Sequence, residues 1–183
     1  PYPNNLFYHV GLNIALYDDD LKLASEYVDR LNAGVLDDAP QYTRLLAQLL
    51  RARLLLAQDD PETALELALA IQKPAKAGSF NWIMIHSSLI EAAAAATLGR
   101  ASDSLQALEH ALTLAAAAEY VRWIFYPSAS LSKMLRQAQA RGIMPDFIDR
   151  VLACLPDASN ASRPSEVAES PLTERELEVL QLV

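Results

Sequence analysis

The sequence predicts an all-α fold built from stacked helix pairs, and two observations lead to this prediction. Apolar residues recur at helical spacing along most of the 183 residues, while only five glycines and few β-branched runs occur. The pattern Asp-x-x-x-Ala-x-Glu also occurs three times, beginning at Asp20, Asp60 and Asp103. Successive copies lie about 40 residues apart, the second interval being slightly longer, and such a period is typical of repeats that contain two helices.

Each copy of the pattern is expected to begin a helix at its aspartate. An N-cap carboxylate accepts hydrogen bonds from the first backbone N–H groups of a helix. In the second copy Pro61 takes the first helical position, where its missing N–H costs nothing. A small residue then marks a close approach of two helices, and apolar residues follow on the same face. These positions are Ala24, Val28 and Leu31, then Ala64, Ala68 and Ile71, then Ala107, Ala111 and Leu114.

A further helix is expected before each aspartate, so that residues 1–119 form three antiparallel helix pairs. One pair cannot bury its apolar face alone, whereas three stacked pairs can. The expected first helices are approximately Leu6–Tyr17, Gln41–Gln58 and Phe80–Leu98, with turns at Asp18–Asp20, Asp59–Asp60 and Gly99–Ser102.

This arrangement resembles the tetratricopeptide repeat (TPR), although the period is longer and the full aromatic and proline signature is missing. The expected architecture is therefore a TPR-like superhelical stack of antiparallel helix pairs. The alternative is an ordinary helix bundle in which the three matches arise by chance.

Residues 120–155 are expected to cap the stack with two more helices. One runs over Ser128–Ala140 and stops at Gly142, a residue suited to a helix C-terminus. The other starts after Pro145 and carries Cys154, which is expected to be a small buried residue. Its apolar side comprises Phe147, Ile148, Val151, Leu152 and Leu155. The preceding aromatic residues, Trp123, Phe125 and Tyr126, either pack against these helices or form an interface patch.

Composition excludes several classes of function. The formal net charge is −8 and the sequence pI is near 4.8, which is the wrong sign for a surface that binds nucleic acid or an anionic membrane. No apolar run is long enough to span a bilayer. A single cysteine cannot form an internal disulfide, and no secretory signal begins the chain, so a cytoplasmic location is expected.

The residues indicate no catalytic or metal site. His9, His86 and His110 lie far apart in the sequence and lack the spacing of metal ligands. No nucleophile motif accompanies them. We therefore expect no enzyme activity, no catalytic residue, no metal and no cofactor in this chain.

A binding surface is expected on the concave side of the stack, which the first helix of each pair lines. Counting back from the small alanine of each second helix gives His9 and Asn13, Leu49 and Arg53, and Ser88 and Glu91. This polar cluster is expected to hold a small polar effector or a protein partner. The alternative is that these are ordinary half-exposed helix residues.

After residue 155 the composition changes. Residues 156–170 are rich in Pro, Ser, Ala and acidic residues, a composition typical of a linker. Residues 171–183 then start a new domain, because Thr173 and Glu176 form a capping box ahead of an amphipathic helix.

The string Leu172-Thr-Glu-Arg-Glu-Leu-Glu-Val-Leu is similar to the opening of the LuxR-type helix-turn-helix domain. The residues that match are Leu172, Thr173, Arg175, Glu176, Glu178, Val179 and Leu180. The resemblance implies that DNA is bound only through the rest of that domain, which contains the recognition helix.

A second resemblance covers about residues 1–155. An alanine-rich helix before Glu119-Tyr-Val-Arg122, and a leucine-rich helix that ends Ala-Arg-Gly142, are similar to the large ATP-dependent, maltose-activator-like regulators of the LuxR type. Those proteins combine a P-loop module, a helical-repeat sensor and a DNA-binding domain. No P-loop motif occurs here, so the resemblance implies that ATP binds upstream of Pro1.

These observations lead to two expectations of function. The first is the effector-sensing or self-association region of a LuxR-type transcription regulator, a piece of a longer bacterial protein that can form homo-oligomers. The second is a TPR-like scaffold that binds protein segments without DNA. An enzyme is the weakest hypothesis, because catalytic residues are missing.

Overall fold

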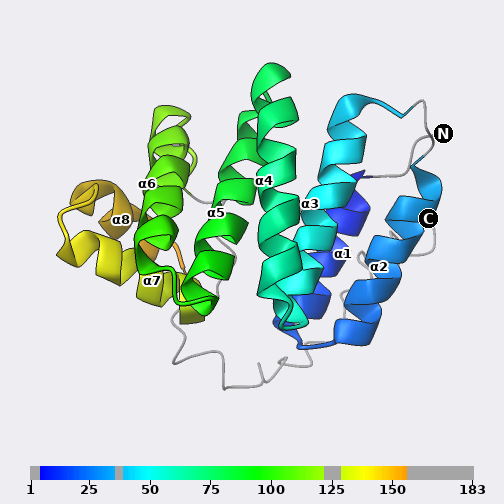
Figure 1. Cartoon of the computed structure of the whole chain (residues 1–183), viewed down its shortest axis with the longest axis horizontal. Coiled ribbons are helices and arrows are strands. Elements are labelled where there is room, and N and C mark those ends of the chain that lie inside the picture. Colours follow the sequence, from blue (N-terminus) through cyan, green and yellow to red (C-terminus); the bar gives the residue numbers. More distant parts are fainter. Residues whose placement is uncertain (1–4, 36–38, 122–128, 156–183) are drawn as a thin grey trace, which may run out of the picture.

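The computed structural model describes residues 5–35, 39–121 and 129–155. These residues form eight α-helices and no strand (Figure 1), which confirms the all-α prediction. The helices are α1 (Asn5–Tyr17), α2 (Leu21–Gly34), α3 (Gln41–Ala57), α4 (Pro61–Ala77), α5 (Asn81–Thr97), α6 (Ala101–Ala117), α7 (Ala129–Ala140) and α8 (Pro145–Leu152).

The helix starts follow a strict period. Helices α2 to α6 begin at Leu21, Gln41, Pro61, Asn81 and Ala101, so their starts are evenly spaced along the chain. One helix pair therefore occupies the sequence interval between every second helix start, for example from Leu21 to Pro61. We call this interval the repeat period. Helices α3 to α6 each contain 17 residues, so the turns between them are also equal in length.

The turns repeat as well. A residue in the left-handed region, with φ between 52° and 74°, follows α1, α3, α4, α5 and α6, at Asp19, Asp59, Ser79, Gly99 and Glu119, whereas Val35 after α2 is extended. The next residue donates its N–H to the carbonyl five positions earlier, as in the bonds from Asp60 to Leu55 (3.0 Å) and from Arg100 to Ala95 (2.8 Å). This geometry pairs carbonyls that a helix end leaves without a partner, and it reverses the chain. Successive helices therefore run in opposite directions.

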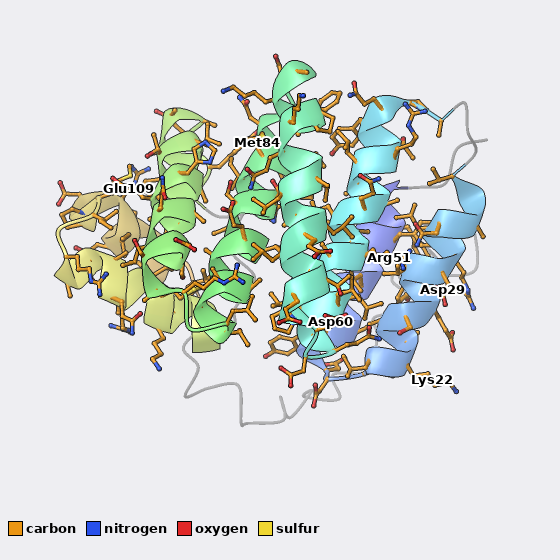
Figure 2. The ribbon with its side chains drawn as sticks, in the orientation of Figure 1. Lys22, Asp29, Arg51, Asp60, Met84 and Glu109 are labelled. Carbon is orange, nitrogen blue, oxygen red and sulfur yellow. The ribbon has the colours of Figure 1, made fainter. Side chains whose placement is uncertain are left out.

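Two of the three predicted N-caps are present. Asp20 accepts the N–H of Leu23 at 2.9 Å, and Asp60 accepts that of Thr63 at 3.2 Å; Figure 2 shows Asp60 at the start of α4. The third prediction is wrong, because α6 begins at Ala101 with Arg100 as its N-cap, and Asp103 lies inside the first turn.

The cause of this error is a shift of register. When the repeat period is continued into α6, Ala24 and Ala64 correspond to Ser104 rather than to Ala107. Residues three positions apart lie on the same side of a helix, and Ser104 and Ala107 are indeed both buried. The third sequence match therefore lies on the correct face of α6, but three residues after the position that the repeat period gives.

Helices α3 to α6 follow one another in sequence order across the molecule, with α1 and α2 at the α3 end and α7 and α8 at the α6 end (Figure 1). Each helix contacts the next. In addition α1 contacts α3, and α3 contacts α5, whereas no contact of similar extent joins α2 to α4 or α4 to α6 in the described part of the chain. The odd-numbered helices α1, α3 and α5 thus form one layer, and the even-numbered helices α2, α4 and α6 cover its other side.

Two apolar clusters fill the interior, and α5 contributes to both. Helices α1 to α5 bury the first, to which α5 supplies Ile83, Met84 and Ile90. Helices α5 to α8 bury the second, which contains Ile85 and Ala92 of α5. Where α1 packs against α2, Gly11 permits a close approach of the two helices. A Cβ atom on Gly11 would lie 2.5 Å from the ring of Tyr27.

The C-terminal helices end the described part of the chain. Helix α7 stops at Ala140, and Gly142 follows with a φ of 77°. Helix α8 buries Phe147, Ile148 and Val151. Cys154 is exposed, contrary to the prediction that it is buried, because it follows the end of α8 at Leu152, where Ala153 is exposed as well and only Leu155 packs back against the second cluster.

Several predictions fall on residues outside the described ranges. They are the aromatic residues Trp123, Phe125 and Tyr126, the linker 156–170, and the LuxR-like string 172–180. Within the described ranges, no helix has both the length and the apolar character needed to cross a membrane.

Candidate functional site

A cleft of about 700 Å³ lies along the layer of odd-numbered helices. Residues of α1, α3, α5, α6 and α7 line it, and most of its wall is aliphatic. A volume of this size is in the range of pockets that hold a small organic molecule. Leu16, Leu49, Leu89 and Leu105 represent the apolar wall.

The cleft follows the repeat period of the helices. Four sets of equivalent residues from α1, α3 and α5 all line it, and α7, which starts at Ala129 outside the repeat period, adds Lys133 and Gln137. The sets are His9, Leu49 and Leu89; Asn13, Arg53 and Ala93; Leu16, Leu56 and Ala96; and Tyr17, Ala57 and Thr97. The same positions of α1, α3 and α5 therefore face the same space.

A polar cluster joins α1 to α3 at one end of the cleft. The Arg53 guanidinium donates a hydrogen bond to Oδ1 of Asn13. Because arginine can only donate, this bond fixes the orientation of the Asn13 amide. Nδ2 of Asn13 then donates to Nε2 of His9 at 3.3 Å. Nε2 of His9 must accept, so the neutral ring carries its proton on Nδ1.

Aromatic rings connect this cluster to α5. The centroid of the His9 ring lies 5.0 Å from that of Trp82 in an edge-to-face arrangement, and Trp82 lies 4.2 Å from His86. His86 is 6 % exposed. These ring contacts hold His9 of α1 against Trp82 and His86 of α5, so they connect the two helices that both neighbour α3 in the layer.

Both histidines of this cluster have a lowered pKa. Burial, and then the charge of Arg53, lower the pKa of His9 from 6.5 to about 4. Burial lowers the pKa of His86 well below 6.5, and the charges of Arg53 and His9 add to this effect. Both rings are therefore neutral at neutral pH, and Arg53 supplies the positive charge of the cluster.

The charged residues that line the cleft are all basic. They are Arg53, Lys133 and Arg141, and no Asp or Glu is among the described lining residues. The chain as a whole has 23 acidic and 15 basic residues. The side chain of Arg53 is half-buried, whereas those of Lys133 and Arg141 are exposed. The cleft thus has a charge opposite to that of the whole chain.

The structure brings together three of the five predicted binding residues, His9, Asn13 and Arg53, and Leu49 lies beside them in the lining. Ser88 and Glu91 lie elsewhere. Ser88 Oγ is 3.2 Å from Nδ1 of His110 on α6, and Glu91 accepts a hydrogen bond from Gln72 of α4 at 2.6 Å. These two residues face the neighbouring helices rather than the cleft.

An uneven count produced this difference. Ser88 and Glu91 lie 19 and 16 positions before Ala107, whereas the residues chosen in the first two pairs lie 15 and 11 positions before Ala24 and Ala64. One repeat period after Leu49 and Arg53 come Leu89 and Ala93, which do line the cleft. Sequence reasoning also missed His86, Lys133 and Arg141 as lining residues, and no repeat signal could have found Lys133, because α7 starts outside the repeat period.

Comparisons of the chain with protein-family models, curated proteins and solved structures found no match. Among the described residues, no group of three or more His, Cys, Asp or Glu is placed to hold a metal ion. What the site can do therefore follows from its own geometry: an apolar cleft, a fixed Arg–Asn–His chain of hydrogen bonds, and a basic rim.

Proposed function

We propose that this chain is the effector-sensing region of a LuxR-type transcription regulator, and that the effector binds in the cleft of the odd-numbered helices. The observation that carries the proposal is the recurrence of lining residues once per repeat period on α1, α3 and α5, which form one cleft that α6 and α7 extend. The resemblance of residues 172–180 to a LuxR-type domain supports the regulatory part.

A TPR-like superhelical stack is the architecture that we propose for the repeats. The contacts of α1 with α3 and of α3 with α5, without equal contacts between the even-numbered helices, favour a layer that curves toward the odd-numbered side. A ligand on that side touches several repeats at once. It therefore stabilises one relative packing of the repeats over others. A change of packing would reach the DNA-binding domain through the linker 156–170.

Calorimetric titration of the chain with a panel of small sugars, amino acids, nucleotides and aliphatic acids tests the sensing function. We expect saturable heat with one class of compound, and loss of that heat in the Asn13→Ala variant, whose substitution disrupts the link between Arg53 and His9. Absence of saturable binding across the panel would contradict the proposal.

The regulatory part needs the protein that carries the complete DNA-binding domain. We expect that protein to shift promoter DNA in a gel, and the effector from the titration to change the affinity. In the same proposal ATP belongs to a segment upstream of this chain. Failure to bind any promoter with and without effector and nucleotide would remove the LuxR assignment.

A second candidate function, self-association or protein binding, has an observation of its own. Phe7, Val10, Ile14 and Tyr17 follow one another at helical spacing on α1, and they are 52 %, 44 %, 56 % and 60 % exposed. An exposed apolar stripe of this kind is typical of an interaction surface.

Sedimentation velocity at several concentrations distinguishes this candidate. A concentration-dependent dimer that Ile14→Glu abolishes would favour self-association through α1. A monomer at all concentrations would leave effector binding as the better supported function.

A further inference from the structure

One face of α1 differs from the same face of the other odd-numbered helices of the repeat. Val10 and Ile14 lie one helical turn apart on α1, and their side chains are 44 % and 56 % exposed. The equivalent residues of α3 and α5, one and two repeat periods later, are no more than 7 % exposed. They are Leu50, Leu54, Ile90 and Ala94. The repeat therefore buries two positions that α1 leaves exposed to solvent, and we call this surface the Val10/Ile14 face.

Other positions of α1 match their equivalents in burial. Leu12 is fully buried, as are both residues equivalent to it, and Tyr17 is exposed, as are both residues equivalent to it. The equivalents are Ala52 and Ala92 for Leu12, and Ala57 and Thr97 for Tyr17. The difference is thus confined to the Val10/Ile14 face, so a general exposure of α1 does not explain it.

The neighbours of each helix explain the difference. Helix α1 contacts α2 and α3, and α3 contacts α4 and α5 in the equivalent way, but α3 also contacts the preceding pair, α1 and α2. Helix α5 likewise contacts the preceding α3 and α4. The Val10/Ile14 face is therefore the surface that a preceding helix pair covers in the later repeats.

The two ends of the described helices also differ in polarity. Helix α1, at one end (Figure 1), contains no Asp, Glu, Lys or Arg. Helix α8, at the other end, exposes Asp146, Asp149 and Arg150. The terminal unit of a repeat array needs a polar outer surface to remain soluble. Helix α8 meets this requirement, whereas α1 has the composition of an internal helix.

We propose that the Val10/Ile14 face is the docking surface for one further helix pair of the same repeat, which precedes α1 in the protein. The inference rests on the repeat period and is independent of the effector-sensing function. In the repeat, each odd-numbered helix after α1 packs against the pair that comes directly before it in the chain. The interface between α3 and the pair α1–α2 is the pattern that the proposed contact continues.

A second copy of the chain fits this face less well. Two aromatic and two aliphatic side chains of α1, each about half exposed, offer roughly 400 Å² of surface. A stable interface between separate proteins buries about 800 Å² on each partner. A helix pair that a short turn joins to α1 needs less area, because the covalent connection gives it a high effective concentration.

The repeat also describes the sequence of the expected pair. Ala24 and Ala64 occupy the same position of successive second helices, and both are fully buried. The residue one repeat period before Ala24 is therefore expected to be small, and those one period before Val28 and Leu31 are expected to be apolar. A large side chain in place of the small residue would contradict the proposal.

Thiol labelling of the protein that carries the residues before Pro1 tests the contact, with the 183-residue chain as the reference. Peptide mass spectrometry follows the labelling of the Ile14→Cys and Tyr17→Cys variants, and the exposed Cys154 serves as an internal standard. Both introduced thiols should react at similar rates in the 183-residue chain. In the longer protein we expect Ile14→Cys to react about 10-fold or more slowly, whereas Tyr17→Cys reacts as before.

Two outcomes of the labelling would overturn the proposal. The first is an unchanged rate at Ile14→Cys in the longer protein, or an equal slowing at Tyr17→Cys. The second is protection of Ile14→Cys that grows with concentration in the 183-residue chain, which would assign the face to a second copy. Val10→Cys carries the same expectation, so a folding defect in one variant does not decide the result.

Discussion

At the scale of the residue, the arginine of the cleft sets the chemistry of its neighbours. Arg53 donates to Asn13, Asn13 donates to His9, and the positive charge disfavours a second proton on His9. His86 experiences the same charge in a fully buried position. The cluster therefore keeps two histidines neutral beside a permanent cation.

The lowered pKa values predict a pH-dependent stability. Between pH 6.5 and about 4 the unfolded chain binds a proton at His9 that the folded chain does not. The free energy of unfolding is therefore highest above this range and decreases as the pH falls through it. We expect a loss on the order of 2 kcal/mol between pH 7 and pH 4.5, allowing for partial exposure of the ring. Urea unfolding at a series of pH values measures this loss.

The variant His9→Gln assigns the effect. Glutamine retains an acceptor for Asn13 and cannot titrate, so the pH dependence should become shallower. His110→Gln is the matched control, since that residue is exposed on α6 and outside the cleft lining. Equal slopes in the native chain and in His9→Gln would contradict the role of His9.

At the scale of the element, each helix of the repeat is determined by its two ends. After α1, α3, α4 and α5 a left-handed residue ends the helix, and the next helix starts two residues later. Where the start carries an aspartate, its carboxylate caps the first turn, as at Asp20 and Asp60. Arg100 takes the equivalent position before α6 and provides no side-chain cap.

The caps predict unequal costs for three aspartates that look alike in the sequence. Asp20→Ala and Asp60→Ala each remove a hydrogen bond to a helix N-terminus and should lower the free energy of unfolding by about 1 kcal/mol. Asp103→Ala loses only a favourable charge in the first turn, worth a few tenths up to about 1 kcal/mol at most. Chemical denaturation compares the three. An Asp103→Ala cost as large as that of Asp60→Ala would show that Asp103 is a cap after all.

The turns predict opposite effects of substitution at two equivalent positions. Ser79 has a φ of 55° and Gly99 a φ of 74°. A left-handed conformation costs an L-residue with a Cβ roughly 1 kcal/mol or more. Ser79→Gly should therefore raise the free energy of unfolding by about 0.5 kcal/mol, after the entropy that glycine loses on folding. Gly99→Ala should lower it by about 1 kcal/mol. Thermal unfolding of both variants measures the difference, and a destabilised Ser79→Gly would contradict the turn geometry.

At the scale of the whole molecule, stability is divided between two apolar clusters that meet at α5. The first extends from α1 to α5 and the second from α5 to α8. The cleft crosses this division, since α1 and α3 line one part and α6 and α7 another. A ligand in the cleft would therefore touch both regions, which α5 and Leu114 of α6 also join.

The division predicts local rather than uniform effects of a cavity. Ile148 is fully buried in the second cluster, and Ile148→Ala should cost about 2–5 kcal/mol. Because repeat-like folds unfold in parts, hydrogen exchange should accelerate most in α7 and α8 and least in α1 to α4. Ile71→Ala, in the first cluster, should produce the reverse pattern. The same acceleration in all eight helices would indicate a single cooperative unit.

The sequence by itself determined the helices and most of their ends. Helical periodicity, Asp20, Pro61 and Gly142 are local signals, and they act through hydrogen bonds and backbone preferences within a few residues. The repeated pattern also placed His9, Asn13 and Arg53 on corresponding faces before any packing was known. Its limit was the third pair, where the match at Asp103 came three positions late and the count back from Ala107 was longer than in the first two pairs, so Ser88 and Glu91 were chosen in place of Leu89 and Ala93.

Only the tertiary structure decided which side chains share the cleft. His86 joins His9 through Trp82, and Lys133 and Arg141 reach the cleft from α7 and the turn after it, although long stretches of sequence separate them from α1. Such proximity depends on how helices pack against one another, which is a sum of many apolar contacts over the whole chain. Local sequence signals do not predict how these packing contacts add up. They predicted the repeating helices, whereas the positive charge of the cleft depends on which side chains the packed helices bring together.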